Sequence, residues 1–270
     1  MFVRVRRWAI WLAIGYVGIG AMLWGLQRRL IYLSGSPVSE EQQMPMAREK
    51  SLTPWHDEKG HHLGWRRERA NAPTMVVFHG NAALAIHRWR LADGLTQAGW
   101  SVALMEYPGY GSRTGSPSRK TLVEAGCDAV DRLAGAGKVY VLGESIGSGV
   151  ACAVAAARPA KVAGLLLVTP FAKLSEVGQR RFPIVPVGLL MGAEDYDNRA
   201  LLKGFAGPAA FVLAGQDEVV GVAQGRGLHQ GFAGTKRSWE QPQSGHNNLE
   251  VDANLPWWAE TTAFLRDQGK

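Results

Sequence analysis

The stretch from Lys138 to Gly149, KVYVLGESIGSG, restricts the fold more than any other part of this 270-residue chain. Its apolar, β-branched first half predicts a strand that leads straight into Gly143-x-Ser145-x-Gly147. A strand that turns at once into a helix forces the serine at the turn into a strained conformation, so only small residues fit two positions before and after it. The two glycines meet that need, and the pattern is that of a nucleophile elbow.

The residues after the elbow predict a helix of small side chains that can pack closely under a sheet. Ser145 would then lie at the helix N-terminus, where the backbone N–H of Ile146 and the positive end of the helix would face a developing oxyanion. A simple Gly/Ser turn between a strand and a helix is the alternative interpretation of the same residues.

Strand and helix patterns alternate along the rest of the chain, which predicts an α/β protein with a mostly parallel, eight-stranded sheet covered by helices on both faces. Glycines and prolines exclude a helix from residues 107–118, and residues 30–50 show no clear period, so we expect a connector there. Two predicted strands flank a turn at residues 57–60, one that contains Trp55 and one at 62–66. The other predicted strands are 74–78, 100–106, 138–143, 164–170, 209–213 and 235–240, and the predicted helices are 84–98, 119–133 and 256–266.

Residues 171–208 interrupt this alternation with Phe182-Pro183, Val185-Pro186 and a run rich in leucine and methionine. We expect a cap-like insertion that covers the site and lines an acyl pocket. An ordinary crossover helix with an irregular start is the other interpretation.

An acid and a histidine follow the last two predicted strands. Asp217 comes just after residues 209–213, and His246 lies in a polar loop after residues 235–240. Ser145, Asp217 and His246 thus occur in the order nucleophile, acid, base, each after a strand, which is the order that this architecture imposes. Asp195 and Asp197 are rival acids, but no strand precedes them. His246 alone would be an unremarkable loop histidine.

The loop after residues 74–78 reads His79-Gly80-Asn81. A loop at this strand end is where an acyl-transfer enzyme of this design places a backbone N–H for the oxyanion, and we expect Asn81 to donate it. His79 lies too early in the chain for the usual base, so we interpret it as a structural residue.

An uncharged apolar run of nineteen residues, Trp8 to Leu26, precedes the α/β pattern. As a helix it would be roughly 28 Å long, which is enough to cross a bilayer. A cleaved signal peptide is the alternative, but Arg28 and Arg29 follow where a small-residue cleavage site would be expected. We therefore predict a membrane anchor at residues 1–30 and a catalytic domain at 31–270, with Trp8, Trp11 and Trp24 near the membrane surfaces.

The distribution of charge along the chain restricts its possible partners. Arg4, Arg6, Arg7, Arg28 and Arg29 supply +5 of the net +7, so the remaining +2 gives no basis for nucleic-acid binding. Three arginines before the apolar run against two after it mildly favour a catalytic domain on the non-cytoplasmic side.

The remaining candidate ligands look structural. Cys127 and Cys152 lie in predicted helices without metal-ligand spacing, and we expect buried thiols. His56, His61 and His62 flank a turn between two strands, and a polar hairpin is favoured over a metal site because adjacent strand residues point to opposite faces.

Five motifs together resemble the α/β-hydrolase superfamily over roughly residues 30–268. They resemble its serine-hydrolase branch with small membrane-anchored α/β-hydrolase-domain proteins and bacterial acylaminoacyl-peptidase-like enzymes. One departure is Val219-Val220, where many relatives have Val-Pro. The motifs are His79-Gly80-Asn81, Tyr107-Pro-Gly-Tyr-Gly111, Gly143-Glu-Ser-Ile-Gly147, Gly215-Gln-Asp217 and Gly245-His246.

The resemblance implies hydrolysis of esters, thioesters or, less often, amides, without a cofactor or metal. Small-molecule or lipid-derived acyl groups are the implied substrates. A non-catalytic, membrane-tethered binding module on the same fold remains the alternative from another functional class. A dehalogenase or epoxide hydrolase is excluded because it would need an acid where this chain has Ser145. The sequence does not determine the oligomeric state.

Overall fold

The computed structural model describes residues 2–135 and 137–269, and its centre is one eight-stranded sheet with the strand order β1-β2-β4-β3-β5-β6-β7-β8. β1 and β2 pair antiparallel, as do β2 and β4, and the remaining neighbours are parallel. The strands are β1 Thr53–His56, β2 His62–Arg67, β3 Thr74–Phe78, β4 Ser101–Met105, β5 Val139–Glu144, β6 Val162–Val168, β7 Ala209–Ala214 and β8 Lys236–Gln241.

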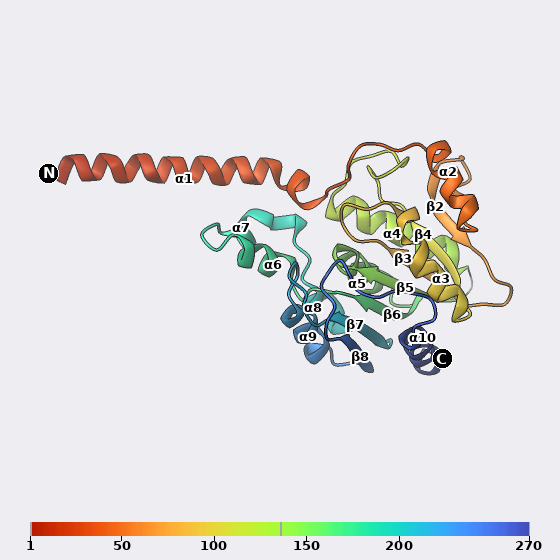
Figure 1. The fold of residues 1–270 in the computed structure, drawn as a ribbon. Helices are drawn as coiled ribbons and strands as arrows, with labels where there is room; N and C mark the ends of the chain where they lie inside the picture. Colours follow the sequence, from red (N-terminus) through yellow and green to blue (C-terminus); the bar gives the residue numbers. More distant parts are fainter. Residues whose placement is uncertain (1, 136, 270) are drawn as a thin grey trace.

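Helices cover both faces of this sheet (Figure 1). The longer ones are α1 Phe2–Ile31, α2 Glu40–Glu49, α3 Trp89–Gln97, α4 Arg119–Ala134, α5 Ile146–Ala157, α6 Leu174–Arg181, α9 Val222–Gly231 and α10 Pro256–Gln268. The short ones are η1 Ala85–Arg88, α7 Val187–Met191, η2 Gly192–Glu194, α8 Asn198–Leu201 and η3 Leu202–Gly204. The predicted mostly parallel α/β sheet is confirmed.

The alternation of side chains along each strand builds two cores, one on each face of the sheet. In β3, Val76 and Phe78 pack with α4 and α5, whereas Met75 and Val77 pack with α3 and α10. All four side chains are at most 1% exposed. Burial on both faces explains why the central strands are apolar throughout and lack the alternation of a half-exposed sheet.

Two helices differ from the sequence prediction. The expected connector contains α2, which begins with a capping box formed by Ser39 and Gln42. α9 was not predicted, because three of its ten residues are glycines and glycine lowers helix propensity. Gly225 explains one of them, since an added Cβ would lie 2.7 Å from Leu213 of β7. The strand β7 therefore needs a small residue on the helix that packs against it.

Helix α1 projects from the rest of the molecule (Figure 1). Residues Arg6–Ile31 are long and apolar enough to cross a membrane, and none of the most apolar part is buried. Trp8, Trp11 and Trp24 are each more than 60% exposed. An exposed apolar helix of this length is unstable in water and suits a lipid environment.

The segment between β6 and β7 contains five short helical elements, from α6 to η3, in place of one crossover helix. α7 lies next to α1 in Figure 1, at the end of the molecule from which α1 projects, and α6 contacts α7. The connection between β6 and β7 therefore passes along α1.

Candidate active site

Ser145 occupies the sharp turn between β5 and α5. Its φ is +52°, in a region that non-glycine residues rarely adopt. A Cβ on Gly147 would lie 2.1 Å from the carbonyl oxygen of Phe78, and one on Gly143 would lie 2.4 Å from that of Gly147. Both glycines are thus required by close backbone contacts, and the backbone N–H of Ser145 is held by the carbonyl of Val168 at 3.0 Å.

Ser145, His246 and Asp217 form one hydrogen-bonded row. His246 Nε2 lies 2.9 Å from Ser145 Oγ, and His246 Nδ1 lies 2.8 Å from Asp217 Oδ2. Because a carboxylate only accepts hydrogen bonds, Nδ1 is the donor to Asp217, and this tautomer directs Nε2 toward the serine hydroxyl as the acceptor. The side chains of His246 and Asp217 are 7% and 4% exposed, so this row is shielded from water.

The second oxygen of Asp217 is held by the turn after β7. Asp217 Oδ1 accepts the backbone N–H groups of Val219, Val220 and Gly221 at 3.1, 2.8 and 3.1 Å. Burial by itself would raise the pKa of the Asp217 carboxyl, but the His246 hydrogen bond and the backbone donors together lower it below its ordinary value. The carboxylate therefore stays ionised beside the imidazole.

The departure at Val219-Val220 has a structural counterpart. The shortest of the three hydrogen bonds to Asp217 comes from Val220, and a proline at that position would have no N–H to donate. Val220 is also 5% exposed and belongs to the core under the turn.

The loop that carries His246 is anchored by the residue after the acid. Glu218 Oε2 accepts the backbone N–H of His246 at 3.1 Å, while the carbonyl of Ser244 accepts the N–H of Gln216 at 2.9 Å. The turns after β7 and β8 therefore hold each other. Sequence reasoning did not single out Glu218, although its position directly after Asp217 was a possible signal.

Asn81 and Ile146, the two expected oxyanion donors, follow β3 and β5, which are neighbours in the sheet. Among the described residues, neither backbone N–H donates a hydrogen bond, so both are free for another acceptor. Both polar atoms of the Asn81 side chain have partners. Its Nδ2 donates to the Ile31 carbonyl at 2.6 Å, and its Oδ1 accepts from the backbone of Leu33 at 2.9 Å and from the hydroxyl of Tyr110 at 3.1 Å.

A further carboxylate connects the loop after β3 to the elbow. Glu144, the residue before Ser145, accepts the backbone N–H of Gly80 at 3.2 Å and pairs with the guanidinium of Arg88. Sequence reasoning missed this pair, since nothing local shows that residues 80, 88 and 144 meet. The two turns that would carry the oxyanion donors are thus held together by a side chain.

His79 has a structural environment. It is 1% exposed, its Nε2 lies 3.0 Å from Glu106 Oε1, and Tyr107 donates its hydroxyl to the His79 carbonyl at 2.9 Å. Glu106 Oε2 also accepts the backbone N–H of Ala85 at 3.1 Å. These buried bonds shape the loop before Asn81, and the interpretation of His79 as a structural residue is confirmed.

The rival acids bind groups away from Ser145 and His246, and the cysteines and histidines occupy structural positions. Asp195 accepts from the backbone N–H and hydroxyl of Ser175 at 2.8 and 2.7 Å, and Asp197 caps α8. Cys127 and Cys152 are buried and free, as expected. The predicted hairpin is confirmed, with His56 and His62 paired across β1 and β2.

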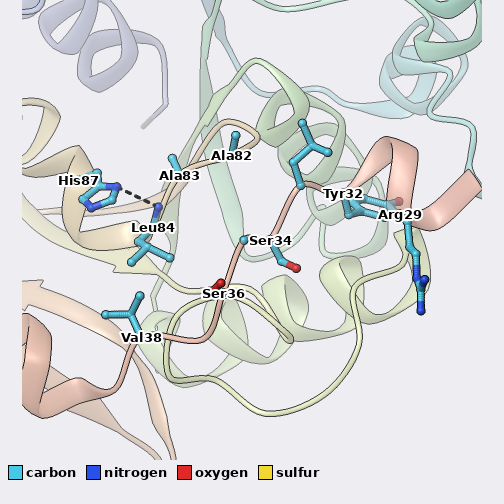
Figure 2. A pocket seen from close by; sticks show the side chains of 11 residues that line it. Arg29, Tyr32, Ser34, Ser36, Val38, Ala82, Ala83, Leu84 and His87 are labelled. Carbon is cyan, nitrogen blue, oxygen red and sulfur yellow. Dashed lines mark hydrogen bonds between the residues drawn. The ribbon is translucent and has the colours of Figure 1, made fainter.

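A cavity of about 610 Å³ opens between the end of α1 and the loop after β3. Figure 2 shows Tyr32 and Ser34 on one side and Ala82, Ala83 and Leu84 on the other. Arg29 and His87 add polar groups to a mainly apolar lining. The cavity borders the loop that carries Asn81, and residues 171–208 are not part of its described lining.

Relatives in sequence identify the family. Residues 73–187 match the family model described as alpha/beta hydrolase fold. An uncharacterized protein of Mycobacterium tuberculosis is 31% identical over 245 residues, which cover 87% of this chain and 85% of the relative. The lysophosphatidylserine lipase ABHD12 of Xenopus tropicalis is 30% identical over 132 residues, 45% of this chain and 34% of the relative. The chain belongs to the α/β-hydrolase superfamily.

A solved structure has the same fold. The crystal structure of a membrane phospholipase A, described as a bacterial virulence factor, matches with a TM-score of 0.65 at 15% sequence identity. The match covers 97% of this chain and 98% of the other. Together with the lipase among the sequence relatives, the family supports hydrolase activity for this protein.

Proposed function

We propose that this protein is a membrane-anchored serine hydrolase that cleaves carboxylic esters or thioesters through an acyl-enzyme. The row of hydrogen bonds from Ser145 through His246 to Asp217 carries the proposal. A serine hydroxyl is a weak nucleophile at neutral pH, and a neutral imidazole within hydrogen-bonding distance supplies the base that it needs.

The reaction begins when Ser145 Oγ attacks the acyl carbon while His246 Nε2 takes the hydroxyl proton. The Asp217 carboxylate holds the imidazole in the required tautomer and stabilises the imidazolium. His246 then gives the proton to the leaving alcohol or thiol. A water molecule, deprotonated by His246, attacks the acyl-enzyme and releases the acid, which regenerates Ser145.

The negative charge on the carbonyl oxygen is held by the backbone N–H groups of Asn81 and Ile146. Both donors are free of other partners in the described part of the chain, and the N-terminus of α5 adds its positive end. Because Glu144 ties the two turns together, the donors are held in place before the substrate binds, which is what makes an oxyanion hole effective.

The substrate is an acyl compound of lipid type. A lipase is among the sequence relatives, and a membrane phospholipase has the same fold. Helix α1 would place the site beside a bilayer, and the cavity between α1 and the Asn81 loop is mainly apolar. Such a cavity suits an acyl chain or a lipid leaving group better than a polar metabolite.

Residues 1–30 form the membrane anchor and residues 31–270 the catalytic domain, with 171–208 as an insertion in it. The exposed apolar surface of α1 supports the anchor. The arginine distribution favours a catalytic domain on the non-cytoplasmic side. Protease protection in sealed membrane vesicles tests this orientation.

A binding module without catalysis has no need for the strained serine or for the buried row behind it. Both features therefore favour an enzyme. Amide hydrolysis uses the same residues but a poorer leaving group, so a peptidase-type activity is a second possibility that substrate comparison resolves.

The decisive experiment is labelling by a serine-directed fluorophosphonate. Wild-type protein and the control Ser116→Ala, which alters an exposed loop serine, should be labelled, and Ser145→Ala should not. Unchanged labelling of Ser145→Ala would reject the nucleophile. Matched p-nitrophenyl esters, thioesters and anilides of increasing chain length then rank the leaving groups and the acyl pocket.

A further inference from the structure

Residues 182–193, which we call the apolar segment, contain no charged side chain. The segment begins directly after α6, includes α7 and ends within η2. Its largest side chains face outward: Phe182, Ile184 and Leu189 are 57%, 83% and 81% exposed. Three large apolar side chains so close together and so exposed are unusual for a surface in water.

The apolar segment runs along the second half of α1 in the same direction as that helix. Tyr16 donates its hydroxyl to the Ile184 carbonyl at 3.0 Å, and Leu190 lies against Gly20. At the base, Arg28 Nε pairs with Glu194 Oε1 at 2.8 Å, and Glu194 also accepts the hydroxyl of Tyr32. The ion pair is therefore at the base, a single side-chain hydrogen bond to α1 is at the tip, and the apolar side chains extend outward along the helix.

The position of the contacts places the tip within the apolar run of α1. Tyr16 and Arg28 are twelve residues apart, which corresponds to roughly 18 Å along a helix axis. The hydrocarbon core of a bilayer is roughly 30 Å thick. If the core begins near Arg28, whatever surrounds Tyr16 and Gly20 also surrounds Ile184 and Leu189.

The backbone of the tip suits an environment without water. Gln179 donates its side-chain amide to the carbonyls of Phe182 and Pro183 at 3.2 and 2.9 Å, and the Tyr16 hydroxyl donates to the carbonyl of Ile184. Backbone N–H groups within the segment bond to the carbonyls of residues 182, 185 and 186. Pro183 and Pro186 have no N–H to satisfy. All five carbonyls from 182 to 186 thus have partners, as a nonhelical chain in lipid requires of these groups, whereas the backbone N–H of Ile184 donates to no described residue.

We propose that the apolar segment inserts into the acyl-chain region of the bilayer that α1 crosses, with Phe182, Ile184 and Leu189 in contact with lipid. This inference rests on the proposed anchor, because the same contacts with α1 define its depth. The lipid is favoured over a protein partner since the exposed side chains continue the lipid-facing surface of α1.

Insertion would also couple the membrane to the active site. Arg180, at the end of α6, donates to the carbonyls of Glu218 and Val219 at 3.2 and 3.3 Å. These two residues follow Asp217 directly. The helix that leads into the apolar segment therefore contacts the turn that holds the triad acid.

The test uses variants of the full chain with one added cysteine each, labelled with an environment-sensitive fluorophore and reconstituted in phosphatidylcholine vesicles. Ile184→Cys and Leu189→Cys report on the apolar segment. Val17→Cys, on the exposed surface of α1, and Gln230→Cys, at the exposed end of α9, are the two controls. Wild-type protein treated with the same label provides the blank, because Cys127 and Cys152 are buried.

Lipids with a nitroxide on the acyl chain should quench labels at positions 184 and 189 as strongly as the label at 17, and at least about fivefold more than the label at 230. Equal quenching at 184, 189 and 230, with strong quenching at 17, would overturn the insertion and leave the anchor intact. If a second copy of the chain covered positions 184 and 189, their labels would also escape quenching and the vesicles would contain dimers. That result would likewise overturn the contact with lipid. No quenching at 17 would reject the anchor itself.

Discussion

The elbow and the apolar segment are built from similar side chains and meet opposite environments. Residues 139–151 and 182–193 are both rich in valine, leucine, isoleucine and glycine. Leu142 of β5 is fully buried, whereas Leu189 of α7 is 81% exposed. Composition therefore does not distinguish a core strand from a surface that faces lipid, and the difference comes from what packs on the other side.

The two regions also use the backbone differently. Around Ser145, neighbouring carbonyls approach so closely that two glycines have no room for a side chain. In the apolar segment, Gln179 and Tyr16 satisfy carbonyls that no neighbouring strand reaches. The elbow should tolerate almost no change, and the segment should tolerate any change that preserves its apolar surface.

The largest expected effect is at the base. His246→Ala should leave the fold intact and lower kcat/KM by roughly 10⁴-fold, as in other catalytic triads. The measurement is hydrolysis of a p-nitrophenyl ester, with His61→Ala as the control because that side chain is exposed. Near-wild-type activity in His246→Ala would mean that another group is the base.

A second comparison makes the same substitution in both regions. Leu142→Ala removes a fully buried side chain and should lower the free energy of unfolding by about 2–5 kcal/mol. Leu189→Ala should change it by no more than about 0.5 kcal/mol in detergent, since little is buried there. Denaturation curves of the two variants check this difference, and similar losses would show that the apolar segment packs against protein.

Asn81→Ala tests the connection between the anchor and the oxyanion loop. Its side chain holds Ile31 and Leu33 at the end of α1, so we expect a looser loop and a decrease in kcat of about 10-fold, smaller than direct loss of an oxyanion donor. Asn254→Ala, an exposed loop residue, is the matched control. Equal activity of the two variants would show that the backbone contacts of the loop suffice to hold it.

The smallest effect concerns pH. The folded-state pKa of Asp217 is below its ordinary value near 3.8, so its contribution to stability is present above that pH and is lost as the pH falls through the folded pKa. The melting temperature of wild type should exceed that of Asp217→Asn at pH 5–7, and the gap should narrow below about pH 3.8. A gap that stays constant down to pH 3 would contradict the assigned shift.

Local patterns predicted much of the sheet, because strands buried on both faces are short apolar runs between glycines and prolines. Residues 74–78 were predicted with the observed ends, and the observed β7 begins at the predicted Ala209. α2 and α9 were not predicted because neither shows a helical apolar period. α2 is marked only by its capping box, and α9 is rich in glycine.

The candidate site was likewise predicted only in part. Ser145, Asp217 and His246 were selected from their order after strands, and parallel strands bring their carboxyl ends to one edge of the sheet. The supporting contacts could not be predicted, because Glu144 with Gly80 and Glu218 with His246 join residues 64 and 28 positions apart. Nothing local in the chain encodes which side chain meets which backbone group.

By itself, the sequence determined the α/β alternation, the elbow and the apolar run of α1, since each depends on neighbouring residues and their spacing. Only the tertiary structure decided that the Asn81 side chain holds the end of α1 and that the apolar segment lies along that helix. Both are contacts between distant parts of the chain, and such contacts depend on how the elements pack.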